Sequence, residues 1–148
     1  MNLTSPEKGF IENMGRLMIG WGLPRTTGRI YAYLLLRPEP TTLDRIAKEL
    51  DVAKSGASVS TRQLVAFGMA RTHRQRGSKR LAFDAIYDLE GVLSAREAQT
   101  RLFMESLQEG ARVASSPGAR RKMSTMSDAI ADVVVRLTSL ARSQRKGR

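Results

Sequence analysis

The chain contains no cysteine and a single histidine, His73. Without cysteine it cannot form a disulfide, a thiolate metal site or a cysteine redox switch, and one imidazole is too few for a histidine-based metal site. No apolar run approaches the roughly 20 residues that a membrane-spanning helix needs, and the first residues do not begin a signal sequence. We therefore expect no metal, no membrane span and a cytoplasmic location.

Catalytic motifs are also absent from the 148 residues. There is no glycine-rich phosphate loop after a predicted strand and no helix-spaced pair of acids on a buried face, so neither an enzyme nor a cofactor is predicted.

Positive charge, in contrast, is in excess: 25 Lys and Arg against 14 Asp and Glu give a net charge of +11. Residues 41–87 carry nine cations and four acids, and residues 116–148 carry eight and two. This excess points to a polyanionic partner, with nucleic acid or an anionic membrane as the usual candidates.

The first 40 residues predict two helices. Thr4 or Ser5 can cap the first, which ends at residues 22–24, and the second runs from about Thr26 to Leu36 before two prolines. Apolar residues recur at helical spacing in the first helix: Phe10, Met14, Leu17, Met18 and Trp21. We expect Trp21, Tyr31 and Tyr33 in the core, with a small-molecule pocket as the alternative.

The next two helices are short and predict a helix-turn-helix. Thr41 with Asp44 has the spacing of a capping box, and an apolar stripe follows it through Leu50. After a break, the stretch KSGASVSTRQLVAFG predicts a helix that ends at Gly68. Its inward positions are small at the front and large at the back: Ala57, Ser60 or Thr61, Leu64 and Phe67. Small contact residues allow two short helices to cross closely, as in a helix-turn-helix.

A basic segment follows, ARTHRQRGSKRLAF, in which five cations surround one glycine. Residues 69–74 and 80–87 can be extended, and a loop of about five residues with a glycine between them indicates a β-hairpin. A helix-turn-helix followed by a hairpin with a basic tip is the plan of a winged helix. The fold predicted is mainly α with a small β-hairpin wing, and N- and C-terminal dimerisation helices flank the winged helix. Residues 1–87 are predicted to form the DNA-binding domain, and residues 88–148 a helical dimerisation region with a basic tail.

In that C-terminal region Asp88 can cap a helix that extends to about Ala114, and Ser116-Pro117 can begin the last helix. The last helix carries apolar residues at alternating steps of three and four: Met123, Met126, Ile130, Val133, Leu137 and Leu140. This seam fits packing against the preceding helix or packing across a two-fold axis, and we favour the second. The tail from Arg142 onward lies beyond the seam, and we expect it to be frayed.

The second helix of the helix-turn-helix would present its outward residues to the major groove. We assign DNA contacts there to Lys54, Ser55, Gly56, Ser58, Val59 and Arg62, because Ser and Arg can bond base edges, Val can touch a thymine methyl and Lys suits a phosphate. In the wing we assign them to Arg71, Arg74, Arg76, Lys79 and Arg80, which fit a narrow minor groove or phosphates. His73 is interpreted as a strand residue near phosphates rather than a pH switch.

With these residues in view, the chain resembles the GbsR/MarR-type winged-helix transcriptional regulators. The resemblance rests on FIENMGRLMIGWGLPRTTGRIYAYLLLRPEP, on TTLDRIAKELDVAKSGASVSTRQLVAFGMA and on the GSKR wing tip, and covers about residues 10–86. It implies a homodimer joined by terminal helices, one recognition helix per subunit in a major groove, and a wing contact from Ser78. Ala53 stands where many relatives have a capping Ser or Thr, which leaves Ser55 as a substitute cap.

Together these patterns predict a homodimeric, sequence-specific regulator of transcription that binds an inverted repeat in double-stranded DNA, and a repressor rather than an activator. The alternatives are a non-specific DNA-coating protein and a winged-helix module that binds RNA or an acidic protein. The sequence identifies neither an operator nor an effector.

Overall fold

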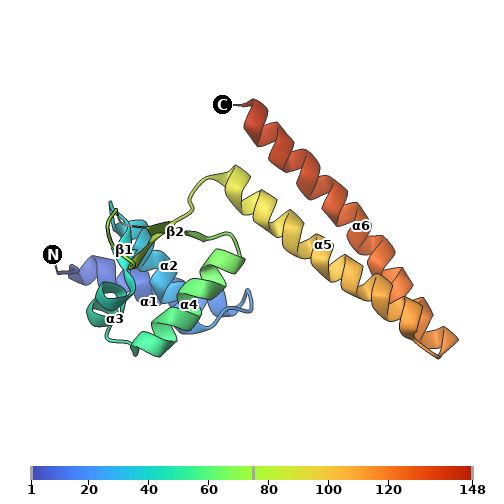
Figure 1. Cartoon of the computed structure of the whole chain (residues 1–148), viewed down its shortest axis with the longest axis horizontal. Coiled ribbons are helices and arrows are strands. Elements are labelled where there is room, and N and C mark those ends of the chain that lie inside the picture. The colour runs from blue at the N-terminus through green and yellow to red at the C-terminus, as the bar shows by residue number, and fades with distance from the viewer. Residues whose placement is uncertain (1, 75, 148) are drawn as a thin grey trace. The chain divides into compact units, whose positions relative to one another are not determined.

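The computed structural model describes residues 2–74 and 76–147 and contains two compact units, Met1–Tyr87 and Asp88–Arg148 (Figure 1). No helix within the described residues is both long and apolar enough to cross a membrane. The first unit contains α1 (Ser5–Ile19), α2 (Arg25–Leu36), β1 (Thr41–Thr42), α3 (Leu43–Leu50), α4 (Lys54–Ala66), β2 (Ala70–Arg74) and β3 (Leu81–Ala85). The second contains α5 (Leu89–Val113) and α6 (Pro117–Lys146).

Local capping residues begin most helices where the sequence predicts them. Thr4 and Glu7 form a complete capping box at α1, and the Asp88 and Ser116 side chains cap α5 and α6. The predicted box at Thr41 is wrong by one residue. The cap of α3 is Thr42, whose Oγ1 accepts from the backbone N–H of Arg45 at 3.4 Å, whereas the Thr41 hydroxyl donates to the Glu39 carbonyl oxygen at 3.2 Å.

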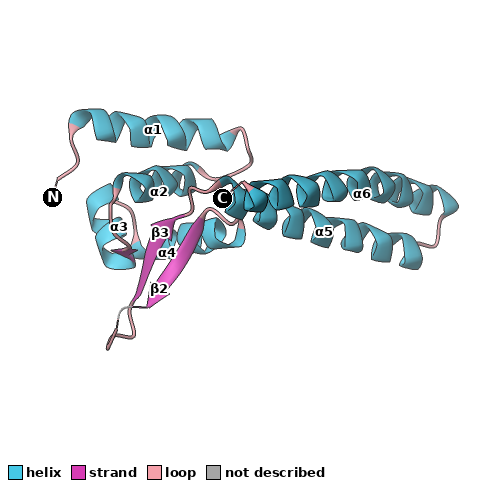
Figure 2. Ribbon diagram, turned by 90° about the horizontal axis from the view of Figure 1, so that it is seen from above, coloured by secondary structure: helices cyan, strands magenta, loops and turns pink. Residues whose placement is uncertain are grey.

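The predicted hairpin is confirmed, with β2 and β3 lying side by side (Figure 2). It belongs to a three-stranded antiparallel sheet in the order β1-β3-β2. Strands β2 and β3 pair from Ala70 opposite Ala85 to Arg74 opposite Leu81. Strand β1 is not predicted by the sequence. It is two residues long, and it exists because Thr41 and Thr42 pair with β3 rather than because of any local pattern.

The core of the first unit lies where α1 to α4 meet the inner face of the sheet, and its largest fully buried side chains are Ile11, Met18, Ile30, Tyr33, Leu34, Ile46 and Leu64. The core assignment is correct for Tyr33. Tyr31 is half-buried against the core and its hydroxyl donates to the Ile86 carbonyl oxygen at 3.1 Å. The core assignment is wrong for Trp21, which follows the end of α1 and is 65% exposed.

In the second unit α5 and α6 pack on each other as a helical hairpin, with Met123 lying over Gly110. The buried residues of α6 are Ser127, Val134 and Ala141. The predicted seam is therefore split: Met123, Ile130 and Leu137 are half-buried, whereas Met126, Val133 and Leu140 are exposed. The expectation of a frayed tail is wrong as far as Lys146, since α6 continues to that residue and Arg145 Nε lies 2.7 Å from Glu90 Oε1 of α5.

Candidate nucleic-acid interface

The inner face of α4 is fixed by small and polar contacts. Ala57, Ser60, Thr61 and Leu64 are all buried, as the small-to-large pattern predicts. The fully buried Thr27 Oγ1 of α2 lies 3.0 Å from Ser60 Oγ and donates to Gln63 Oε1 at 2.7 Å. Because a buried hydroxyl without a partner would destabilise the fold, these contacts set the rotation of α4 about its own axis.

The opposite face of α4 is open to solvent and carries the predicted base-contacting residues. Lys54, Ser55, Val59 and Arg62 are exposed, and Gly56 and Ser58 are half-buried. Arg62 Nε donates to the Ser58 carbonyl oxygen at 3.3 Å, which holds the guanidinium along this face. The residue before α4 is Ala53, and no described side chain makes a capping hydrogen bond there, so Ser55 does not act as the substitute cap.

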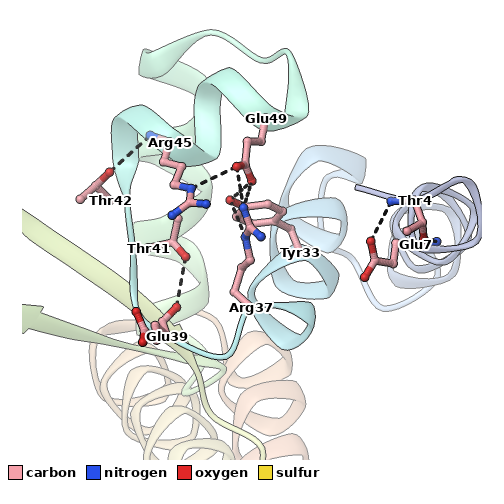
Figure 3. A network of polar contacts seen from close by, with 9 residues as sticks. All are labelled: Thr4, Glu7, Tyr33, Arg37, Glu39, Thr41, Thr42, Arg45 and Glu49. Atoms are coloured by element: carbon pink, nitrogen blue, oxygen red, sulfur yellow. Dashed lines mark hydrogen bonds and ion pairs between the residues drawn. The ribbon is translucent and has the colours of Figure 1, made fainter. Parts of the chain in front are cut away.

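A polar cluster ties α3, the first helix of the helix-turn-helix, to α2 (Figure 3). The Glu49 carboxylate accepts hydrogen bonds from Tyr33, Arg37 and Arg45, and the Arg37 guanidinium lies over the Tyr33 ring. Burial, reinforced by the bond to Glu49, raises the pKa of Tyr33. The phenol therefore stays protonated and donates to the carboxylate, which fixes the position of α3.

The wing presents cations along β2 and around its tip. Arg71, Arg74, Arg76, Lys79 and Arg80 are exposed. Gly77 adopts a left-handed conformation, with φ of 77°, that favours glycine in the turn, and the half-buried Ser78 Oγ accepts from the Arg80 backbone N–H at 3.1 Å. Ser78 thus shapes the tip. His73 lies on β2 with Nε2 3.9 Å from Asp84 Oδ2 of β3, as expected for a strand residue.

A groove of about 440 Å³ joins the two predicted sets of contacts. Lys54, Ser58 and Arg62 of α4 line one side, and Lys79 and Arg80 of the wing line the other. Thr42, Leu43, Asp44, Thr61, Leu81 and Phe83 complete the lining. The groove therefore gathers five residues that the sequence assigns separately, while Ser55, Gly56, Val59, Arg71, Arg74, Arg76 and Ser78 lie outside its lining.

Sequence reasoning assigned Asp44 only to a capping box and missed that it lines this groove. Its Oδ1 lies 2.7 Å from Lys54 Nζ, and the Lys54 ammonium, followed by the charge of Arg80, lowers the pKa of Asp44. The signal in the sequence is an acid in the first turn of a helix, which capping alone can explain. Only the fold shows that this acid faces the entrance of α4.

The fold of this chain has counterparts among known structures. A crystal structure described as that of a transcriptional regulator matches 97% of this chain and 99% of its own, with a TM-score of 0.83 and 22% sequence identity. The fold is a winged helix. More distant similarity links the chain to a mutant of Staphylococcus aureus MepR bound to an oligodeoxyribonucleotide (TM-score 0.45, 16% identity, 86% and 90% of the two chains) and to a mutant of Lactococcus lactis ZitR (0.39, 17%, 74% and 74%). No protein-family model and no curated protein matches the sequence.

Proposed function

We propose that this winged-helix protein is a sequence-specific, double-stranded-DNA-binding transcriptional regulator of the GbsR/MarR type. The observation that carries the proposal is the groove in which Arg62 and Ser58 of α4 face Lys79 and Arg80 of the wing. A helix whose exposed face has short side chains can approach base edges in a major groove. The adjoining cations fit the phosphates that border such a helix.

The proposed contacts divide by chemistry. Arg62, Ser58 and Val59 read bases, because a guanidinium can bond guanine, a hydroxyl can donate or accept, and Val can touch a thymine methyl. Lys54, with Ser55 and Gly56 beside it, approaches phosphates at the start of α4. The wing residues Arg76, Ser78, Lys79 and Arg80 enter a minor groove or bind its phosphates, and Arg71 and Arg74 border the approach.

We further propose that the protein acts as a homodimeric repressor on an inverted repeat. Met126, Val133 and Leu140 recur every seven residues on α6 and remain exposed, and Leu17 and Trp21 are exposed at the end of α1. Exposed apolar stripes of this kind mark protein–protein contacts. A two-fold dimer would present two copies of α4 to half-sites about one helical turn apart.

The test is selection of binding sites from a random duplex pool at about 0.15 M salt, where non-specific affinity is suppressed. An enriched inverted repeat supports the proposal. Strong, salt-sensitive binding without enrichment would instead support a DNA-coating protein, and binding to RNA or to an acidic protein alone would support an interaction module.

On the selected site, Arg62→Ala should relax the preference at one base pair per half-site, reducing discrimination there by about 1–3 kcal/mol. The matched control is Arg74→Ala on β2, which removes the same charge and should weaken all duplexes alike. Competition binding with single-base variants of the site measures both. Intact discrimination in Arg62→Ala would show that this residue does not read a base.

A further inference from the structure

Asp44 is the one acidic residue among the described side chains that line the groove between α4 and the wing. Four cations line the same groove: Lys54, Arg62, Lys79 and Arg80. The carboxylate is paired with Lys54 at 2.7 Å, and both side chains remain more than half exposed. The pair is therefore accessible from outside and is not part of the core.

A carboxylate at this place opposes the binding of a polyanion. It repels the phosphates that the cations attract. It is also already paired with Lys54, the cation at the start of α4, which is the proposed recognition helix. The charge of Arg80 also acts on it, in the same direction as that of Lys54, to lower the pKa of Asp44. An exposed ion pair of this kind is weak, so a well-placed phosphate can displace the carboxylate, whereas a poorly placed one gains little by doing so.

We propose that Asp44 is a specificity-determining residue that competes with the DNA backbone for Lys54, so that a phosphate replaces it only where α4 is seated on its own site. The inference rests on the proposed DNA-binding function. Non-cognate duplex, on which phosphates meet the groove in many registers, is penalised by the retained carboxylate. On the cognate site the contacts of Arg62 and the wing hold one phosphate at Lys54, and the carboxylate is displaced.

The experiment compares wild type, Asp44→Asn, Lys54→Gln and the double variant on the selected site and on random duplex, across a salt series. Asp44→Asn should bind random duplex about 3- to 10-fold more tightly, with a smaller gain on the selected site, so that the specificity ratio falls. On random duplex, where the wild-type carboxylate stays on Lys54, freeing Lys54 for a phosphate should steepen the slope of log affinity against log salt by about 1 per protomer. Because a gain of affinity is expected, partial unfolding cannot imitate it.

The matched control is Glu39→Gln, which changes the net charge by the same amount in the same unit but lies outside the groove lining. Glu39→Gln should leave the specificity ratio unchanged. In the Lys54→Gln background the gain of affinity caused by Asp44→Asn should shrink. An equal gain in Glu39→Gln, or a full gain without Lys54, would reduce Asp44 to a general charge and overturn the inference. A changed preference at one base pair with unchanged random-duplex affinity would overturn it in favour of a base contact.

The two levels of the proposal fail differently. If the wild type binds duplex and Asp44→Asn behaves identically, the inference about Asp44 is wrong while the proposed function stands. If the wild type binds no duplex under any salt condition, the proposed function is wrong and the inference falls with it.

Discussion

Glu49 joins α3, the first helix of the helix-turn-helix, to the end of α2, because its carboxylate accepts hydrogen bonds from Tyr33 and Arg37 as well as from Arg45 one turn away on α3. Partial burial raises the pKa of Glu49, but the hydrogen bonds from Tyr33 and Arg45 and the charges of both arginines outweigh it and hold the pKa below its usual value. A carboxylate with a folded-state pKa below its unfolded value stabilises the fold fully above the unfolded value. That stabilisation is lost as the pH falls through the folded value.

Glu49→Gln should therefore lower the free energy of unfolding at pH 7 by about 1–3 kcal/mol, because a charged acceptor with three donors is replaced by a neutral amide. The difference from wild type should shrink as the pH falls below about 4.3, the ordinary pKa of a glutamate, because the wild-type carboxylate then also becomes neutral. Urea denaturation at neutral, mildly acidic and strongly acidic pH measures it, with Glu39→Gln as the control. A deficit that stays constant across pH would assign the role of Glu49 to packing rather than charge.

At the scale of helices and strands, features set by neighbouring residues could be predicted and features set by distant ones could not. The Thr4 and Asp88 caps and the small inner face of α4 follow from local chemistry. Strand β1 does not, since Thr41 becomes a strand residue only through its pairing with β3. The pairing of Asp44 with Lys54 likewise depends on how α3 and α4 cross, which no local pattern specifies.

The crossing of α1 and α2 makes a testable case at this scale. A Cβ at Gly28 would lie 2.9 Å from the Met14 carbonyl oxygen and 3.0 Å from the Gly15 Cα, both backbone atoms that cannot rotate away. Gly28→Ala should force the helices apart and destabilise the protein by about 1–3 kcal/mol, although alanine favours a helix. Gly9→Ala in α1, where a Cβ meets nothing within 4 Å, should instead stabilise it by up to about 1 kcal/mol. Thermal melting compares the two, and equal effects would contradict this close crossing.

At the scale of the whole molecule, the sequence leaves open whether the α6 seam packs within the chain or between chains. Within the second unit the half-buried residues Ile130 and Leu137 pack on the side of α6 that faces α5, whereas Val133 and Leu140 remain exposed. A heptad pattern alone cannot separate these outcomes, because the same a/d spacing suits a partner helix of the same chain and one of a second chain. The buried Ser127 and Ala141 show which flank α5 covers.

The exposed flank of α6 predicts that two copies of the chain form a dimer. If Met126, Val133 and Leu140 are covered by a second copy, the wild type should have twice the 16.4 kDa mass of one chain in sedimentation equilibrium. Val133→Asp should then shift it to the monomer, since a carboxylate without a partner in an apolar interface is strongly unfavourable. The matched control is Val135→Asp on the opposite flank of α6, where the side chain is 67% exposed, and the dimer should persist. A two-fold operator needs two recognition helices held together, so Val133→Asp should also lose the preference for an inverted repeat over a single half-site. A wild type that is monomeric and still prefers the inverted repeat would contradict this assembly.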